Sequence, residues 1–271
     1  CLPHETIDAG NSGQVLRFVA AIAALCEGET VMTGDHSVQT NRPVKPLISG
    51  LNQLGASCQS VRQNDHAPIR IQGPIRAGEV SIDGEDSQPV SALLMACAFL
   101  KGETSLTVNH PGETPWIDLT LSWFDRLGIA YENQAYQQYH LLGYAEINAF
   151  DLSIPGDFSS IAFPLVAAII TGSHLVISEV DMQDVQGDKA VVDVLIKMGA
   201  DIRYDEKNHR LMVSPVNALC GLEVDVNDFI DALPILAVVG CFATGETILK
   251  NAAVARLKES DRINAMATEL K

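Results

Sequence analysis

The sequence predicts a mixed α/β (α+β) fold in two domains, with helices inside and sheets outside. The first observation is a repeat: Gly-Glu-Thr, or once Gly-Ser-His, follows an apolar, alanine-rich run four times, 70 to 74 residues apart. The four glycines are Gly28, Gly102, Gly172 and Gly245. A second marker, a glycine directly after Leu or Met, keeps the same period at Gly55, Gly128 and Gly199. Self-similarity at a fixed period indicates one supersecondary unit copied along the chain.

The first repeat predicts two helices between short extended segments. In order, we expect a strand at 5–8, a turn and helix N-cap at 11–13, a helix at 14–26, a strand at 30–33, a helix from 43 to 55 and a β segment at 67–71. Gly28 is expected to follow the end of the first helix as a C′ glycine. Pro43 is favoured in a first helical turn, and Leu47, Leu51 and Leu54 keep helical spacing.

The later repeats follow the same order and predict buried helices. A helix is expected from Pro115 to its stop at Gly128, and another after Asp188 with a stop at Gly199. The runs 90–100 and 163–170 contain no charged residue, and a helix that is apolar all round is buried on all sides.

A break near residues 148–155 predicts the boundary between the domains. We expect a first domain at 1–153 with two repeats and a second at 154–271 with one complete and one shortened repeat.

Composition excludes several classes of protein. With 47% hydrophobic and 19% charged residues the chain can bury a large core. No apolar stretch reaches the roughly 18 residues of a membrane span, and the amino end does not resemble a signal peptide. The net charge of −16 argues against a nucleic-acid partner. Six scattered cysteines suit a reducing cytoplasm, and the histidine and cysteine spacing predicts no metal site.

Residues 256–262 form the densest charged segment, with five charges in seven residues. We expect a helix to begin here, where the amino-terminal end favours anions. Lys258 and Arg262 could then clamp an anion, while Glu259 could move a proton. A solvated, charged helix start is the alternative interpretation of this segment taken alone.

Lys258-Glu-Ser-Asp-Arg262 resembles the signature of the EPSP synthase (3-phosphoshikimate 1-carboxyvinyltransferase) family of enolpyruvyl transferases. Further segments resemble that family in the same order: 8–14 with Arg17, 34–43, 87–95, 115–121, 132–138, 155–160 and 230–232. The resemblance implies a two-domain inside-out α/β barrel of repeated βαβαββ units, with the active site in the cleft between the domains. It also implies that this chain is a fragment without the family's two ends, inactive by itself.

The reaction implied by the resemblance is transfer of the enolpyruvyl group of phosphoenolpyruvate to the 5-hydroxyl of shikimate 3-phosphate, without metal or cofactor. By the family pattern the catalytic residues are Asp231, Lys258 and Glu259. Phosphoenolpyruvate is expected at Gly13, Arg42, Gln88 and Arg262. Shikimate 3-phosphate is expected at Ser87, Gln88, Trp116, Asp231 and Lys258. A cytoplasmic monomer with small-molecule substrates, and with neither nucleic acid nor membrane as partner, completes the expectation.

Three residues depart from the family pattern: Asp86, Glu113 and Val254. The two carboxylates would repel a phosphate by like charge unless they turn away or stay protonated. A diverged, non-catalytic relative is therefore one alternative. The other is UDP-N-acetylglucosamine enolpyruvyl transferase, but the loop at 34–41 lacks the cysteine of that enzyme.

Overall fold

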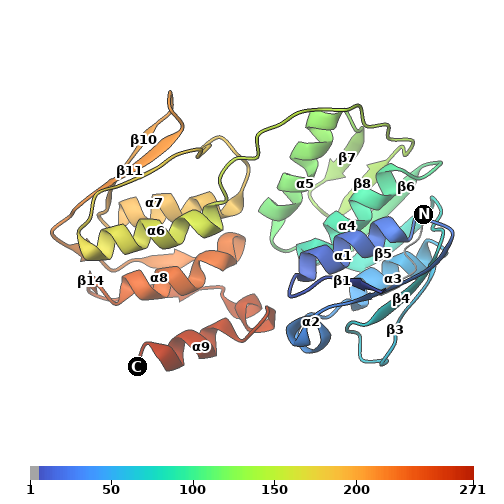
Figure 1. The fold of residues 1–271 in the computed structure, drawn as a ribbon, viewed down its shortest axis with the longest axis horizontal. Coiled ribbons are helices and arrows are strands. Elements are labelled where there is room, and N and C mark those ends of the chain that lie inside the picture. Colours follow the sequence, from blue (N-terminus) through green and yellow to red (C-terminus); the bar gives the residue numbers. More distant parts are fainter. Residues whose placement is uncertain (1–5) are drawn as a thin grey trace. The chain divides into compact units, whose positions relative to one another are not determined.

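The computed structural model describes residues 6–271, which divide into two compact parts (Figure 1). The first lobe ends at Ala149 and the second begins at Phe150. Each lobe has its own cluster of buried hydrophobic residues, and each is described by itself. Among residues 6–271, no helix combines the length and the apolar composition that crossing a bilayer requires.

The first lobe contains two repeats with the same order of elements. The first consists of β1 (Ile7–Asp8), α1 (Gly13–Ala23), β2 (Gly28–Thr33), α2 (His36–Thr40), α3 (Lys45–Gln53), β3 (Ser57–Ser60) and β4 (Ile69–Gly73). The second consists of β5 (Glu79–Asp83), α4 (Ser87–Ala98), β6 (Thr104–Asn109), α5 (Thr114–Leu127), β7 (Tyr131–Gln134) and β8 (Gln138–Leu141). Both repeats have the element order βαβαββ, except that the first also contains the short helix α2, which was not predicted.

The sheets of the two repeats share one topology. Their strand orders are β1-β2-β4-β3 and β5-β6-β8-β7. In each sheet the first pair is parallel, because a helix crosses between its strands, and the later pairs are antiparallel. This shared topology confirms the predicted repeat.

The helices of the first lobe lie inside and its sheets outside. Helix α4 packs against α1, α3 and α5, and nearly all of its residues are buried. In strand β5, Val80 and Ile82 are buried whereas Glu79, Ser81 and Asp83 are exposed. Such alternation is typical of a sheet with one face on the core and one in water.

The second lobe repeats the pattern with fewer strands. Its elements are α6 (Phe158–Thr171), β9 (Leu175–Ile177), α7 (Ala190–Lys197), β10 (Asp201–Asp205), β11 (Arg210–Ser214), β12 (Leu219–Cys220), β13 (Glu223–Asp225), α8 (Leu233–Gly240), β14 (Ala243–Thr244), β15 (Ile248–Lys250) and α9 (Arg262–Glu269). Short 3₁₀ turns lie at Gly187–Lys189, Asn227–Ala232 and Ala253–Leu257. Strand β11 lies between β10 and β9, as β4 and β8 do between their neighbours, and β13 pairs in parallel with β15.

The predicted end of the first helix was wrong. Helix α1 stops at Ala23, and Gly28 instead opens strand β2. The reason lies at Ala24, whose carbonyl accepts a hydrogen bond from the backbone N–H of Ile75 (2.8 Å) and so leaves the helical ladder. The second helix was also placed early, since α3 begins at Lys45 rather than Pro43. Of the strand expected at 5–8, Glu5 lies outside the described residues.

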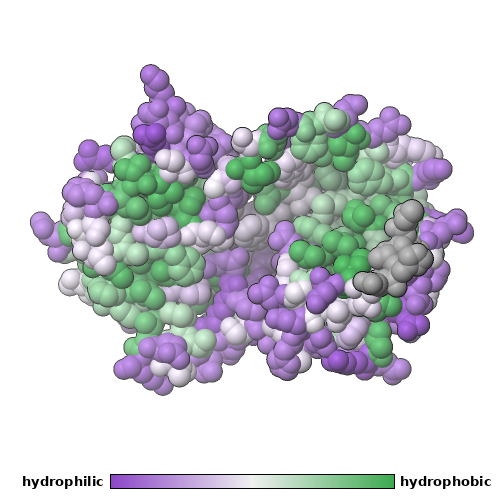
Figure 2. Space-filling view, in the orientation of Figure 1, coloured by the Kyte–Doolittle hydropathy of each residue, from purple (hydrophilic) through white to green (hydrophobic). Residues whose placement is uncertain are grey.

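The expectation that 163–170 is buried on all sides was wrong as well. Helix α6 covers this run, but Phe163 is 53% exposed, and Pro164 and Ala167 are exposed beside it. Figure 2 shows hydrophobic surface over α6 and α7 of this lobe. The corresponding run in the first lobe lies on α4, which packs against α1, α3 and α5, whereas α6 packs against α7 and α8 and leaves this face exposed.

Candidate active site

A pocket of about 630 Å³, lined by both charged and apolar side chains, lies within the second lobe. Its lining residues come from the starts of α6, α8 and α9 and the segment before α9: Ser159, Ser160, Phe163, Asp231, Pro234, Glu259, Ser260, Arg262, Ala265 and Met266. Three of these are predicted site residues.

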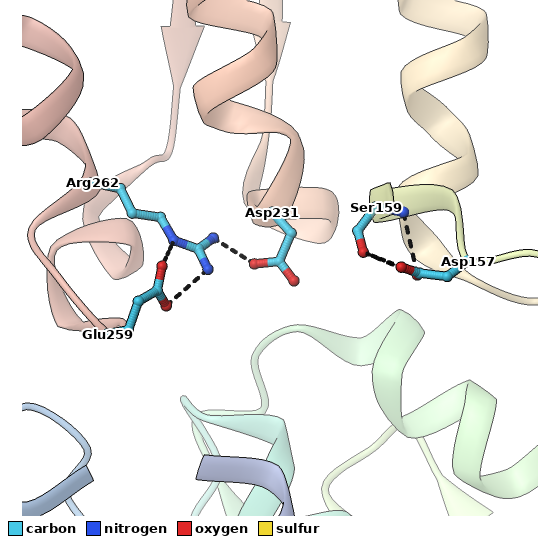
Figure 3. A network of polar contacts seen from close by, with 5 residues as sticks. All are labelled: Asp157, Ser159, Asp231, Glu259 and Arg262. Atoms are coloured by element: carbon cyan, nitrogen blue, oxygen red, sulfur yellow. Dashed lines mark hydrogen bonds and ion pairs between the residues drawn. The ribbon is translucent and has the colours of Figure 1, made fainter. Parts of the chain in front are cut away.

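Arg262 joins two carboxylates in this pocket (Figure 3). Its Nε and Nη2 donate to the two carboxylate oxygens of Glu259 at 2.8 and 3.0 Å, and its Nη1 donates to Oδ1 of Asp231. The Arg262 side chain is only 16% exposed. We call Asp231, Glu259 and Arg262 the Arg262 cluster.

The charge state of this cluster follows from its geometry. Burial lowers the pKa of Arg262, but the hydrogen bonds and charges of Glu259 and Asp231 outweigh it and leave that pKa above its ordinary value. The guanidinium therefore stays charged. It carries five N–H groups, and three of them bond these carboxylates, so two remain for a bound oxyanion.

Local structure places each member of the cluster. Asp231 lies in the 3₁₀ turn Asn227–Ala232 that leads into α8. Asp261 caps α9 by accepting from the backbone N–H of Asn264 at 3.0 Å, so Arg262 is the first helical residue. The expected helix start is confirmed, but Lys258 and Glu259 precede it, and Lys258 has extended backbone.

The amino-terminal end of α6 brings further polar groups to the pocket. Asp157 is the N-cap and accepts from the backbone N–H of Ser159 at 3.3 Å (Figure 3). It also accepts from the backbone N–H of Ser160 at 3.1 Å. Both serine hydroxyls also donate to Asp157. No role was predicted for Ser159 and Ser160, although their segment resembles the family pattern.

A second group of predicted site residues gathers in the first lobe around Arg17. Nη1 of this arginine donates to Oε1 of Gln88 at 2.7 Å, and Nη2 lies 2.8 Å from the carbonyl of Pro43 and 2.9 Å from Oδ2 of Asp86. Arg17 is 1% exposed. We call Arg17, Pro43, Asp86 and Gln88 the Arg17 cluster.

Gly13 and Arg42 lie beside this cluster. A Cβ added to Gly13 would come within 2.7 Å of Nη1 of Arg17 and 3.5 Å of Cδ of Arg42. Gly13 thus stands where a side chain would displace the buried guanidinium. The predicted phosphoenolpyruvate residues of this lobe, Gly13, Arg42 and Gln88, are therefore neighbours of one arginine.

The structure accounts for the two unexpected carboxylates. Asp86 forms an ion pair with Arg17 and caps α4 by accepting from the backbone N–H of Gln88 at 3.0 Å. Glu113 is 4% exposed and accepts a hydrogen bond from Oγ of Ser87 at 3.3 Å. Both carboxylates are therefore held by groups of the first lobe.

Trp116 follows Glu113 in the first turn of α5 and is half-buried. Its backbone N–H donates to the carbonyl of Glu113 at 3.1 Å. Arg17 was expected only as part of a segment that resembles the family, and no role was predicted for it. It is the only charged residue in helix α1 and stands four residues after Gly13, on the same helical face, which is the signal that could have identified it.

Comparison with known proteins identifies the family of this chain. A family profile described as EPSP synthase (3-phosphoshikimate 1-carboxyvinyltransferase) matches residues 1–271. The chain belongs to the EPSP synthase family. The resemblance stated for the sequence is thereby confirmed.

Curated relatives within the EPSP synthase family share about two fifths of the residues. The 3-phosphoshikimate 1-carboxyvinyltransferase of Ruminiclostridium cellulolyticum is 41% identical over 269 residues, which are 99% of this chain and 63% of the relative. That of Acetivibrio thermocellus is 42% identical over 270 residues, 100% of this chain and 63% of the relative. The chain thus spans about three fifths of the length of these relatives.

Solved structures support the fold. EPSP synthase from Acinetobacter baumannii superposes with a TM-score of 0.76 and 28% identity, over 98% of this chain and 61% of that one. The enolpyruvyl transferase NikO from Streptomyces tendae, at 16% identity, gives a TM-score of 0.63 and covers 90% of this chain and 74% of its own. The second similarity concerns the fold alone.

Proposed function

We propose that the protein carrying this chain transfers the enolpyruvyl group of phosphoenolpyruvate to the 5-hydroxyl of shikimate 3-phosphate. In the addition step the hydroxyl oxygen bonds to C2 of phosphoenolpyruvate, loses its proton, and C3 gains one. In the elimination step C3 loses a proton and phosphate leaves. Membership of the EPSP synthase family supports this proposal.

The single observation that carries the proposal is the Arg262 cluster. A guanidinium with two N–H groups left for an oxyanion lies between two carboxylates in one pocket. Oxyanion binding by an arginine fork and proton transfer by positioned carboxylates are the two demands of the reaction. We assign Arg262 to phosphoenolpyruvate, Glu259 to the proton at C3, and Asp231 with Lys258 to the acceptor hydroxyl.

The first lobe is assigned to the remaining contacts. Gly13, Arg42 and Gln88 would bind phosphoenolpyruvate, and Ser87, Gln88 and Trp116 would bind shikimate 3-phosphate. This assignment is supported by Asp86, because its negative charge is paired with Arg17. Glu113, which accepts from Ser87, is buried and so is not presented to solvent as a free surface charge.

Phosphate release by the full-length protein tests the function. With phosphoenolpyruvate and shikimate 3-phosphate together we expect one phosphate per enolpyruvyl group transferred, and none with either substrate alone. A folded protein that releases no phosphate would be a non-catalytic relative. Replacing shikimate 3-phosphate with UDP-N-acetylglucosamine tests the other alternative, and phosphate release with that acceptor alone would overturn the assignment.

We also propose that residues 1–153 and 154–271 form the two domains. We propose further that the full-length protein is a monomer and is located in the cytoplasm. Sedimentation of the full-length protein at several concentrations checks the oligomeric state. A mass that rises with concentration toward twice the monomer value would contradict it.

A further inference from the structure

Arg17 is a buried cation whose partners lie far apart in the sequence. Its side chain is 1% exposed, and its hydrogen-bond partners Pro43 and Gln88 are 26 and 71 residues away. Burial of an arginine is costly unless the charge is paired and its N–H groups are bonded. Asp86 supplies the pairing charge, at 2.9 Å.

The contact with Gln88 fixes the orientation of that side-chain amide. A guanidinium has N–H donors and no acceptor, so only the amide oxygen of Gln88 can face it. The 2.7 Å contact from Nη1 to Oε1 has this orientation. Because one end of the amide is occupied by Arg17, the NH₂ end, with its two donors, points away from the arginine.

The remaining contacts of Arg17 fix the positions of the groups around the Gln88 amide. Nη2 donates to the carbonyl of Pro43, the residue directly after Arg42. Asp86, the partner of Nη2, also caps the helix on which Gln88 stands. Gly13 leaves space for Nη1, since its added Cβ would lie 2.7 Å away.

We propose that Arg17 is a positioning residue for anion binding: it holds Gln88 with its NH₂ group presented as the donor for an oxyanion of phosphoenolpyruvate and fixes the backbone next to Arg42. The inference rests on the proposed function for the identity of the anion. Arg17 itself does not touch the substrate. A lysine cannot replace it, because a single ammonium does not reproduce a planar fork with separate donors for Gln88, Pro43 and Asp86.

A double-mutant cycle in the full-length protein tests the inference. The variants are Arg17→Lys, Gln88→Met and the double variant, each with kcat and both KM values measured. If Arg17 acts through Gln88, each single variant raises the KM for phosphoenolpyruvate about 10-fold, the loss of roughly one charge-assisted hydrogen bond. The double variant then loses no more than the worse single one. The KM for shikimate 3-phosphate should change less in Arg17→Lys.

Two results would overturn the inference. The first is a KM for phosphoenolpyruvate within about twofold of wild type in Arg17→Lys, which would mean that only the charge matters. The second is a double variant whose effect equals the product of the single effects, which would mean that the two residues act independently. Urea unfolding of each variant separates a loss of fold from a loss of binding.

Titration of the same four proteins with phosphoenolpyruvate by calorimetry separates this inference from the proposed function. If the wild-type protein binds phosphoenolpyruvate but releases no phosphate, the proposed reaction is wrong. The coupling between Arg17 and Gln88 can still be determined in that case, from the dissociation constants of the four proteins. Coupled losses in those constants support the positioning role of Arg17, and independent losses contradict it.

Discussion

At the scale of single residues, Glu259 combines two tasks that are usually separate. It holds the Arg262 guanidinium through both carboxylate oxygens, and under the proposed function it protonates the substrate. A buried guanidinium left without carboxylate partners is strongly destabilising, so the first task belongs to the stability of the pocket. A substitution that keeps an acceptor for Arg262 distinguishes the two tasks.

Glu259→Gln is such a substitution. The amide oxygen can still accept from Arg262, whereas the side chain can no longer deliver a proton, so kcat should fall by about 100-fold or more while the KM for phosphoenolpyruvate changes little. Steady-state kinetics of the full-length protein measures both. Glu259→Asp is the matched control, because it keeps the carboxyl and shortens the reach. Unchanged turnover in Glu259→Gln would remove this residue from proton transfer.

Two cysteines should be chemically inert in the folded protein. Burial raises the pKa of the Cys58 thiol to about 12 and that of Cys97 to about 12, and only the thiolate reacts readily. Alkylation at pH 8 followed by peptide mass spectrometry should find both unmodified. The exposed Cys26, Cys220 and Cys241 are the internal controls and should be alkylated. Rapid labelling of Cys58 or Cys97 under native conditions would contradict their burial.

At the scale of elements, the Asp157 cap makes the stability of α6 depend on pH. Burial alone would raise the pKa of Asp157, but hydrogen bonds from Ser160 and Ser159 outweigh it and leave the pKa below its ordinary value. A carboxyl with a depressed pKa in the folded state stabilises fully above its unfolded pKa, roughly 3.9, and loses that stabilisation as pH falls through the folded value.

Asp157→Ala should therefore lower the free energy of unfolding by about 1 kcal/mol at pH 7. The difference in unfolding free energy between variant and wild type, which we call the gap, should become smaller below about pH 4, because the wild-type carboxyl is protonated there. Urea unfolding at pH 7, 5 and 3 measures the gap. Asp157→Ser, which keeps a capping oxygen without charge, should show a smaller gap that does not depend on pH. A constant gap for Asp157→Ala would contradict the ionic contribution.

The elements differ in how far the sequence predicts them. Local signals located the stop of α5 at Gly128, which adopts a left-handed conformation. They also predicted a helix start within 256–262, where α9 begins at Arg262. The end of α1 depends on a hydrogen bond between Ala24 and Ile75, residues 51 positions apart, which no local pattern reveals. The exposure of α6 likewise depends on which neighbours pack against it, and periodicity contains no information about neighbours.

The candidate site also has a part that the sequence predicts and a part that it does not. The residues of the Arg262 cluster were expected together because they match one family pattern. Arg17 was noted only as part of a matching segment, since its role comes from Pro43, Asp86 and Gln88, which tertiary structure brings to it. Asp86 illustrates the limit most clearly: the sequence suggested repulsion of a phosphate, whereas the structure pairs its charge.

At the scale of the whole molecule, the two hydrophobic cores are separate and a stretch without helix or strand joins them. Residues 146–154 are all exposed. The preceding residues are held by hydrogen bonds from Tyr144 and Ala145 to the first lobe, but Phe150 is 60% exposed. Exposed connecting segments are the preferred sites of proteolysis.

Chymotrypsin in limiting amounts should therefore cut first after Phe150. Mass spectrometry of the early products should find the two fragments on either side of that bond before any others. Phe150→Ala should slow this cleavage, and Phe163→Ala, which changes an exposed residue inside a helix, should not. Early cleavage within α4 or α6 instead would contradict Phe150 as the most accessible site.

Arg17 takes its partners from both repeats of the first lobe: Pro43 belongs to the first, and Asp86 and Gln88 to the second. The oriented amide therefore exists only in a chain whose two repeats have already docked. Ligand and correctly assembled lobe are then thermodynamically linked, so the anion should favour the assembled state over any form in which one repeat has come loose. Substrate binding would in this way report on the quality of folding as well as on chemistry.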